Sequence, residues 1–185
     1  DCIRTKRMIW TYTFPKHKEM KNSLLESIKY SQGKEFANDC DQITKTDYYE
    51  KLELEQKHYL TLFHSNIHDM YVQMQDYYCL AQFSLYNGWY QQYYTGDTHA
   101  WHVHALTTLS MVYYLELEEP ADRTEFWIPE TREICQADAK EGDMVIFPAH
   151  IPHRSPPISG NTRKTIISIN YNVGAIDSKK INNGK

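Results

Sequence analysis

The sequence lacks the features that identify membrane, secreted and zinc-knuckle proteins. No run approaches the roughly 18 apolar residues of a membrane-spanning helix, and the first residues, DCIRTKRM, contain no apolar segment of the signal-peptide kind. The four cysteines, Cys2, Cys40, Cys79 and Cys135, are far apart and form no C-x-x-C pair, which argues against a disulfide framework. We therefore expect a reduced, cytoplasmic protein that does not use a membrane as a partner.

Blocks of like charge are also missing. The net charge of −4 comes from 20 basic and 24 acidic residues that are spread along 185 positions. Because no basic stretch is present to bind a phosphate backbone, nucleic acid is not an expected partner. The length suits a single domain, 1–185, that buries about two thirds of its unfolded surface. Composition does not decide the oligomeric state or whether a substrate is a small molecule or a peptide.

The first 77 residues carry mainly helical patterns. Residues 8–15 alternate bulky and polar side chains before a proline, which predicts a short strand. Apolar residues at three- and four-residue spacing predict a helix within 18–31 and a long helix over 48–75. The polar stretch between them, 35–46, is predicted to be a loop.

The pattern changes at residue 78. Short runs rich in β-branched and aromatic residues, broken by Asn-Gly, Pro and Gly-Asp, continue to residue 173, and a polar tail follows over 174–185. Strands at this spacing favour a barrel or a double-sheet jelly roll. We predict a mainly β fold, a cupin-like double-stranded β-helix over 78–173, with the strand and helices of 1–77 packed on its outer face.

Three histidines are candidate metal ligands. In the stretch THAWHVH, His102 and His104 stand two residues apart, so both side chains would project to the same side of a strand. The stretch GDMVIFPAHIPH supplies a third imidazole, His153, from another strand. Other histidines lack such support: His64 and His68 are four apart on a predicted helix but without the Glu of H-E-x-x-H.

The spacing around these histidines strengthens the metal hypothesis. Five residues separate Gly96 from His102, and five separate Gly142 from Pro148, which lies just ahead of the third histidine. This two-part arrangement is similar to that of double-stranded β-helix proteins, which include cupins and iron oxygenases. His99 has the wrong parity for the same strand face and is at most a supporting or substrate-contacting residue.

A cation on the next strand suggests an anionic ligand. In RKTIISIN, Arg163 lies ten residues after His153, and Thr165 follows two residues later, so both could project toward the metal. An arginine inside a β-barrel is costly unless it meets an anion, and its fork geometry suits a carboxylate. On this reasoning Lys164 should point the opposite way.

About half of the chain resembles the core of an Fe(II)/2-oxoglutarate-dependent oxygenase. A branch of small oxygenases shares H-x-H, S-G-V-Y-Y-L, F-P-x-x-x-x-H and R-x-S-I-S-x-N, and this chain reads HVH, SMVYYL, FPAHIPH and RKTIISIN. The resemblance implies an enzyme that uses iron and 2-oxoglutarate to hydroxylate a substrate, releasing succinate and CO₂. It also implies site residues, which are the iron ligands His102, His104 and His153 and the cosubstrate ligands Arg163, Thr165 and Tyr114.

A further donor to the cosubstrate is expected on the preceding strand. Tyr93 is the preferred candidate, with Gln92 and Tyr94 as alternatives. One departure is that most such oxygenases carry an acid where this chain has His104, so the site is one unit more positive and should hold Fe(II) less tightly.

Two other classes of protein remain open. A cupin-type dioxygenase or isomerase would use the same three histidines without 2-oxoglutarate, although the Glu of the first cupin motif is missing after HVHALTT. A non-catalytic jelly-roll binding module with a structural metal is the other. The aromatic run FSLYNGWYQQYY could line an entrance, and Trp89 and Trp101 could stack on a flat or prolyl group, but aromatic residues of a jelly roll are more often core.

Overall fold

The computed structural model describes residues 8–50 and 52–182. The helical segments are α2 (His17–Tyr30), η1 (Leu54–Gln56), α3 (His58–His64), α4 (His68–Tyr77), η2 (Pro120–Asp122) and α5 (Ser178–Asn182). The strands are β1 (Trp10–Thr13), β2 (Lys34–Ala37), β3 (Gln42–Thr46), β4 (Leu80–Tyr93), β5 (His99–His102), β6 (Leu109–Glu116), β7 (Glu125–Ile128), β8 (Glu133–Gln136), β9 (Asp143–Pro148), β10 (His153–Ser155) and β11 (Lys164–Ile176).

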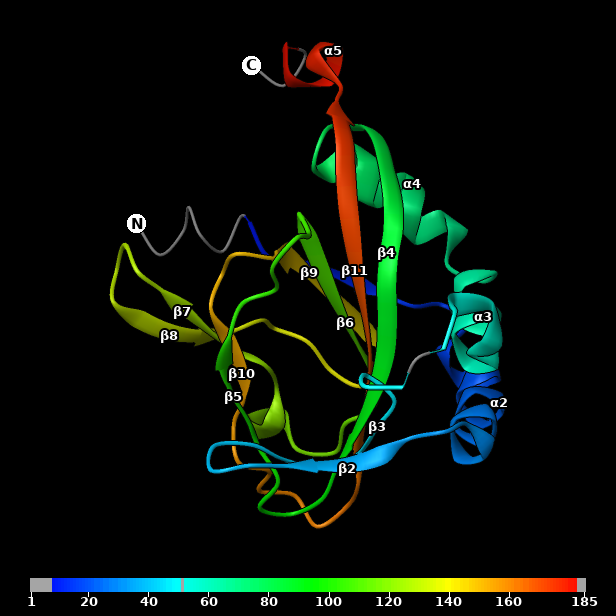
Figure 1. Cartoon of the computed structure of the whole chain (residues 1–185). Helices are drawn as coiled ribbons and strands as arrows, with labels where there is room; N and C mark the ends of the chain where they lie inside the picture. The colour runs from blue at the N-terminus through cyan, green and yellow to red at the C-terminus, as the bar shows by residue number, and fades with distance from the viewer. Residues whose placement is uncertain (1–7, 51, 183–185) are drawn as a thin grey trace.

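The strands form two antiparallel sheets (Figure 1). The larger sheet has the order β1-β9-β6-β11-β4-β3-β2, and the smaller has the order β5-β10-β7-β8. From β4 to β11 the chain passes back and forth between the two sheets, which is the winding of a jelly roll. The predicted double-stranded β-helix is therefore confirmed.

The larger sheet contributes to two hydrophobic cores because its side chains alternate between its faces. On β11, Ile166 packs into the core between the two sheets, and Ile167 packs into the core under the helices. Figure 1 shows α2 and α3 lying over the outer face of this sheet. Long apolar and aromatic side chains fill both cores, so the inner face of the sheet is held rigidly around the site.

The prediction of one continuous helix over 48–75 is wrong. The segment contains η1, α3 and α4, with a break at residues 65–67. At this break Ser65 Oγ donates to the Thr61 carbonyl and Asn66 Nδ2 donates to the Leu62 carbonyl, at 2.8 and 3.0 Å. Such side-chain bonds to the preceding turn compete with helix propagation. The predicted apolar face survives as buried residues, which are Leu60, Phe63, Ile67, Met70 and Met74.

The predicted loop at 35–46 is instead the hairpin β2–β3, which extends the larger sheet through β4. An edge hairpin needs few apolar residues, and here Ile43 supplies a buried contact. The hairpin also touches the smaller sheet, because Asp41 Oδ1 accepts a hydrogen bond from the Ala100 N–H at 2.8 Å. It therefore lies across one side of the barrel mouth (Figure 1).

The C-terminal prediction also needs correction. The expected polar tail begins at residue 174, but β11 stays paired with β4 as far as Ile176, opposite Leu80, and α5 follows. In the part of the chain that the structure describes, no helix is long and apolar enough to cross a membrane. Cys40 and Cys79 carry free thiols, and Cys2 lies outside the described residues.

Candidate metal centre and adjoining cavities

The three predicted histidines come together between the sheets. His102 ends β5 and His153 begins β10, and the two residues are paired directly across the smaller sheet. His104 lies just beyond β5, where its backbone N–H donates to the Ala149 carbonyl at 3.0 Å. Its place relative to His102 is thus fixed by a loop contact rather than by a continuous strand.

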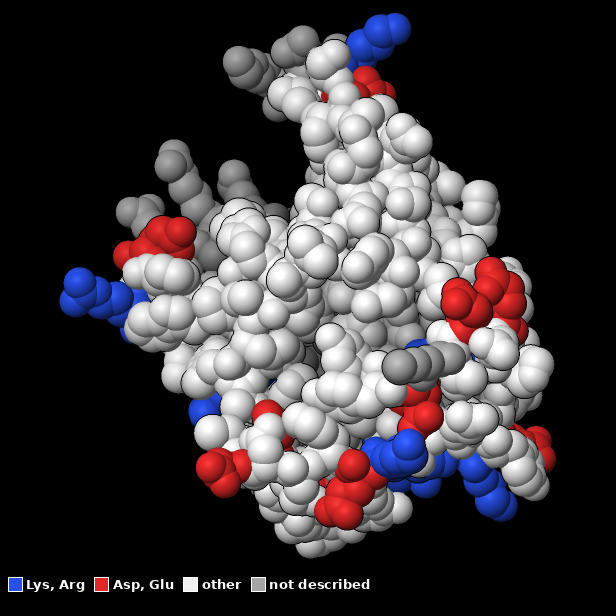
Figure 2. Space-filling view, in the orientation of Figure 1, with Lys and Arg blue, Asp and Glu red and all other residues white. Residues whose placement is uncertain are grey.

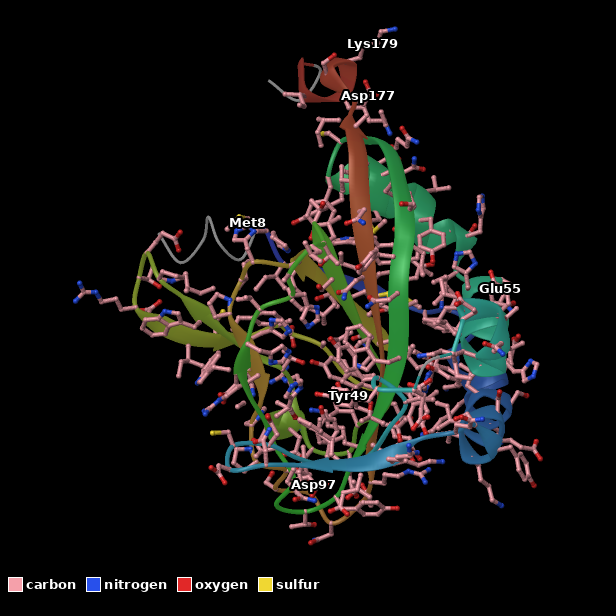
Figure 3. The ribbon with its side chains drawn as sticks, viewed as in Figure 1. Met8, Tyr49, Glu55, Asp97, Asp177 and Lys179 are labelled. Carbon is pink, nitrogen blue, oxygen red and sulfur yellow. The ribbon has the colours of Figure 1, made fainter. Side chains whose placement is uncertain are left out.

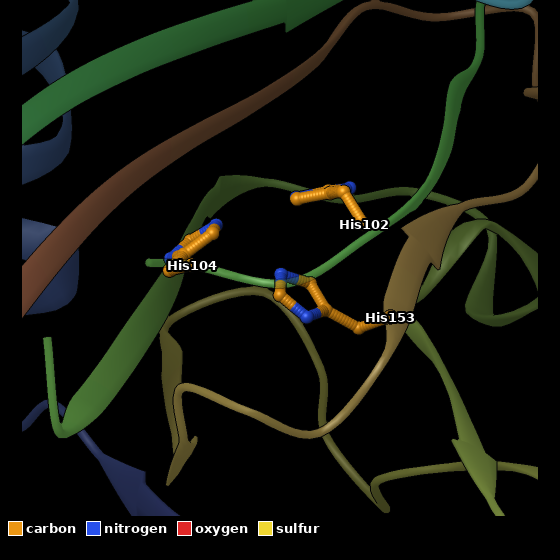
Figure 4. Close-up of side chains that lie close together, drawn as sticks. All are labelled: His102, His104 and His153. Carbon is orange, nitrogen blue, oxygen red and sulfur yellow. The ribbon is translucent and has the colours of Figure 1, made fainter. Parts of the chain in front are cut away.

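The imidazoles converge on one point, as Figure 4 shows. One ligand atom from each of His102, His104 and His153 lies within 4.8 Å of the other two. Metal–nitrogen bonds of about 2.0–2.1 Å require these atoms to move slightly closer around an ion. Within the described residues, this trio alone among His, Cys, Asp and Glu side chains is grouped closely enough to hold a metal.

Each ring is oriented through its Nδ1 atom. Nδ1 of His102 is 2.7 Å from the Ala100 carbonyl, and Nδ1 of His153 is 2.9 Å from the Ile151 carbonyl. Because a carbonyl can only accept, Nδ1 carries the proton in both rings. The lone pair is therefore on Nε2 and is available to a metal.

His104 is oriented by side chains instead. Its Nδ1 atom lies 2.7 Å from Oδ1 of Asn170 and 2.8 Å from Oγ of Ser110. Ser110 in turn donates to the same Asn170 oxygen at 2.7 Å. The amide oxygen thus accepts from His104 and leaves Nε2 of this ring free as well.

Burial keeps the imidazoles neutral, which is the form that binds a metal. Loss of hydration lowers the pKa of His104 to about 4, and it also lowers the pKa values of His102 and His153. The neighbouring histidines lower the pKa of His153 further, because they disfavour a second positive charge.

His99 lies beside the cluster without joining it. Its ring stacks on that of His102 with 3.9 Å between centroids, and its Nδ1 atom is 3.3 Å from Nε2 of Gln91. Burial lowers its pKa to about 3. His99 therefore lies next to the histidine cluster, and its supporting or substrate-contacting role stays a prediction.

Arg163 and Thr165 lie elsewhere than the sequence analysis expects. The guanidinium of Arg163 donates to Glu116 through Nε and one terminal nitrogen at 2.8 and 2.9 Å, and Thr165 also donates to Glu116. Gln92 donates to Thr165 on the same face. This is the outer face of the sheet, because the alternating neighbour Ile167 packs under the helices. The two residues therefore point away from the histidines.

Lys164 occupies the inner position instead. Its side chain is 2% exposed, and its ammonium group donates to the Asp122 carbonyl at 2.6 Å and to Ser155 Oγ at 2.8 Å. Among the described residues no carboxylate forms an ion pair with it. Burial lowers its pKa to about 7. Lys164 and Arg163 point in opposite directions, as expected. However, Lys164 points inward and Arg163 outward, which is the reverse of the prediction.

Aligning the motif on its final Asn, rather than on its first basic residue, places Lys164 at the basic position. In R-x-S-I-S-x-N the basic residue stands six positions before Asn, and the residue six positions before Asn170 is Lys164. Arg163 is seven positions away. Because strand side chains alternate, this shift of one residue changes the face of the sheet.

Both predicted tyrosines face the interior. Tyr114 Oη donates to Thr124 Oγ1 at 3.0 Å and accepts from the Thr124 N–H at 2.9 Å. Tyr93 is fully buried, its ring lies 5.1 Å from the Lys164 ammonium, and its hydroxyl has no hydrogen-bond partner among the described residues. Gln92 lies on the outer face and Tyr94 is half exposed, so of the three candidates Tyr93 is the inward one.

Two cavities adjoin the histidine cluster. The inner one is small, about 20 Å³, and lies among the three histidines, Tyr93, Thr124 and Ser155. The outer one measures about 460 Å³ and reaches from His102 and His104 to the surface. Trp89 lines both cavities, whereas Trp101 lines neither and stacks its ring under Arg154. The sequence pattern alone predicts the same role for these two tryptophans.

Comparison with known proteins identifies the fold. No protein-family model matches the sequence, and no curated protein matches it. A 2OG-Fe(II) oxygenase family member from Burkholderia pseudomallei matches with a TM-score of 0.72 and 9% identity, over 89% of this chain and 85% of its own. These values show that the chain has the double-stranded β-helix fold of Fe(II)/2-oxoglutarate-dependent oxygenases.

Two further structures are similar over most of their length. HygX from Streptomyces hygroscopicus, solved with nickel and 2-oxoglutarate bound, matches with a TM-score of 0.70 and 8% identity, over 94% of this chain and 85% of its own. The non-heme α-ketoglutarate-dependent epimerase SnoN from nogalamycin biosynthesis matches with a TM-score of 0.69 and 12% identity, over 92% and 83%. At such identities the likeness concerns the fold alone.

Proposed function

We propose that this protein is an Fe(II)- and 2-oxoglutarate-dependent oxygenase that hydroxylates its substrate. The observation that carries the proposal is the pairing of two features inside one barrel. Three neutral imidazoles with free Nε2 atoms converge on one point, and Lys164 is buried in the same barrel interior with no carboxylate partner among the described residues. The fold of the chain supports the same reading.

The residues present fit a divalent metal. Imidazole nitrogen suits Fe(II), and the hydrogen bonds at Nδ1 hold each ring in the orientation and tautomer that a metal requires. His102, His104 and His153 would be the ligands. Three neutral ligands leave the metal site one charge unit more positive than two histidines and a carboxylate, so we expect weaker retention of Fe(II).

The inner face also fits a carboxylate. A buried ammonium group is costly without an anion, and that of Lys164 lies over the ring of Tyr93, whose buried hydroxyl has no hydrogen-bond partner among the described residues. Lys164 and Tyr93 would bind the distal carboxylate of 2-oxoglutarate, with Ser155 as a further donor. Arg163 and Thr165 are not proposed for this role, because they are bonded to Glu116 on the other face.

The cosubstrate needs more room than the inner cavity has. A cavity of 20 Å³ holds about one water molecule, so a five-carbon dicarboxylate requires the lining side chains to move apart. Lys164 and Tyr93 could turn toward the incoming carboxylate, because each has hydrogen-bonding capacity that the protein does not use fully.

Iron and 2-oxoglutarate, when bound, supply the chemistry: O₂ converts the 2-oxo acid to succinate and CO₂ and places one oxygen atom on the substrate. The protein positions these groups and keeps water out. Phe126 and Phe147 pack around His153 behind the ligands, with ring centroids 6.2 and 4.7 Å from it. A dry, rigid wall on that side leaves the outer cavity as the path for the substrate.

The buried lysine separates this proposal from the cupin alternative. A three-histidine cupin that uses no 2-oxoglutarate has no need for a desolvated cation near its metal, and Lys164 would then only reduce the stability of the protein. The ion pair of Arg163 with Glu116 does not favour the cupin reading, because Lys164 takes over the inner position.

Release of succinate tests the proposal. Protein loaded with Fe(II) and supplied with 2-oxoglutarate, ascorbate and O₂ should form succinate and CO₂ even without a substrate, though slowly. His153→Ala protein, prepared in the same way, should form none, because it lacks a metal ligand. Equal succinate from both proteins would attribute the turnover to free iron and overturn the proposal.

A further inference from the structure

The walls of the outer cavity carry no charged side chain among the described residues. The cavity, about 460 Å³, has the size of a site for a small organic molecule. Its lining contains rings, short apolar side chains, amides and the histidines described above. The residues that matter for its ligand are Phe36, Tyr48, Tyr49, Tyr86, Trp89 and Leu106.

The rings form a continuous aromatic wall that leads from the metal ligands to the surface. The Trp89 ring meets the His104 ring at a centroid distance of 5.4 Å and the Tyr48 ring at 4.9 Å. Tyr49 continues the wall 4.9 Å from Tyr48 and packs on Phe36 at 4.7 Å. Figure 3 labels Tyr49 beside the lower part of β4 and above β2.

The wall ends in an apolar rim. Tyr48 is 50% and Tyr49 60% exposed, and Leu106, which also lines the cavity, is exposed. In the space-filling view uncharged residues cover the centre of this face, and the charged side chains gather toward its lower and outer parts (Figure 2). Contiguous exposed apolar residues around a cavity are typical of a binding site rather than of a plain surface.

Amide groups supply the polar contacts next to the metal ligands. Asn170 Nδ2 donates to Asn87 Oδ1 at 2.9 Å, and Gln91 interacts with His99, both of which line the two cavities. Such groups can hydrogen-bond a hydroxyl or carbonyl, but they cannot neutralise a charge. A charged ligand here would lose its hydration without gaining a counter-ion.

We infer that the outer cavity takes an electrically neutral, ring-bearing small molecule, which stacks on the wall formed by Trp89 and Tyr48 and presents a ring position to the metal. The inference rests on the proposed function where it treats this ligand as the substrate. The two carboxylates of 2-oxoglutarate would cancel the charge of Fe(II), so the metal centre adds little attraction for an ion of either sign. The test must distinguish this neutral ligand from a peptide or a charged metabolite.

A matched series of naphthalenes provides the test. 2-Naphthol is neutral at pH 7, 2-naphthoate is an anion, and 2-naphthylmethylamine is a cation, while the ring system is the same in all three. We expect 2-naphthol to bind at least about tenfold more tightly than either ion. Binding would be measured by calorimetry on metal-free protein and, without O₂, on protein loaded with Fe(II) and 2-oxoglutarate.

Two variants show whether the ligand uses the aromatic wall. Tyr48→Ala should weaken 2-naphthol binding about 3- to 10-fold, because one ring contact is lost. Tyr30→Ala, which removes a 76% exposed tyrosine on α2 outside the cavity, should leave binding unchanged. Both side chains are at least half exposed, so neither change threatens folding.

The outcomes separate this inference from the proposed function. Equal or tighter binding of either ion, or an equal effect of the two tyrosine variants, would overturn the neutral-ring inference whatever the cosubstrate does. No binding of any of the three probes would overturn it as well. If the neutral preference holds while 2-oxoglutarate fails to bind, the cavity keeps its ligand class and the oxygenase proposal fails.

Discussion

Two of the histidines share one local device. His102 and His153 each donate from Nδ1 to the carbonyl two residues earlier, that of Ala100 and that of Ile151. The bond fixes the ring within its own strand and raises the basicity of Nε2. His104 lacks this device and depends on Asn170, which joins it to the last strand. The candidate metal site is thus assembled from two local hydrogen bonds and one long-range contact.

Replacing one ligand should abolish metal uptake. His153→Ala should lower the affinity for Fe(II) or Zn(II) about tenfold or more, because two ligands hold a metal poorly. After dialysis the variant should retain less than about a tenth of the metal that wild-type protein retains. His150→Ala is the matched control, since His150 is exposed and lies outside the cluster. Metal content measured after dialysis checks this, and equal content in the two variants would contradict the assigned ligands.

The titration of Lys164 should make 2-oxoglutarate binding depend on pH. The folded-state pKa of about 7 lies below the usual 10.5, so the ammonium is lost as the pH rises through about 7. Only the charged form pairs with a carboxylate, so affinity should fall above pH 7 by up to about tenfold per unit. Lys164→Arg should flatten this dependence, because arginine stays charged.

Calorimetric titrations between pH 6.5 and 8.5 would measure this dependence with both proteins. Raising the pH should change the stability of the protein in the opposite direction to its affinity for 2-oxoglutarate. The depressed pKa means that the unfolded chain holds this proton more strongly, so the cost of burying the charge declines as the pH rises above about 7. If the affinity for 2-oxoglutarate changed equally with pH in wild-type and Lys164→Arg protein, the role given to Lys164 would be contradicted.

At the scale of elements, the carboxylate of Asp97 joins β3 to the turn between β4 and β5. Asp97 Oδ2 accepts from the Thr44 N–H at 3.2 Å, from the Thr44 hydroxyl at 2.6 Å and from the Tyr94 N–H at 2.9 Å. Asp97 is buried in the turn between β4 and β5, which Figure 3 labels below β2. This turn therefore holds the hairpin over the mouth of the outer cavity.

Removing this carboxylate should destabilise the protein. Asp97→Ala leaves two backbone N–H groups without their acceptor and should lower the free energy of unfolding by about 2–4 kcal/mol. Asp97→Asn keeps one acceptor oxygen and should cost clearly less. Urea unfolding measures both values, and an alanine variant as stable as the asparagine variant would show that the turn does not depend on these bonds.

The elements also show what sequence patterns can and cannot predict. The period of the apolar residues correctly predicted the buried face of α3 and α4, but Ser65 and Asn66 end α3 through bonds that the period does not reveal. The β2–β3 hairpin was missed because an edge strand carries few apolar residues. The first failure concerns local side-chain bonds to the preceding helical turn, and the second concerns the pairing of β3 with β4, which is distant in the sequence.

At the scale of the whole molecule, the strand pattern of the second half was enough for the fold. Of the three histidines, His102 and His153 follow the geometry of neighbouring strands, whereas His104 reaches the cluster through a loop contact that the H-x-H spacing does not reveal. Arg163 was expected inside the barrel, but a shift of one position exchanges the faces of a strand, and its neighbour Lys164 takes the inner position. Composition gives no signal that distinguishes them, whereas the register of β11 against β4, with Lys164 opposite Tyr93, does.

The central claim is that one barrel interior holds a three-histidine iron site and a lysine that anchors 2-oxoglutarate. The most direct measurement is an anaerobic Fe(II) titration with and without 2-oxoglutarate, followed by the metal-to-ligand charge-transfer absorption of the chelated cosubstrate. Wild-type protein and Arg163→Ala should both develop this band with similar affinity for 2-oxoglutarate, whereas Lys164→Met should need about 10- to 100-fold more. Absence of the band in iron-loaded wild-type protein, or a loss of affinity in Arg163→Ala but not in Lys164→Met, would contradict the account.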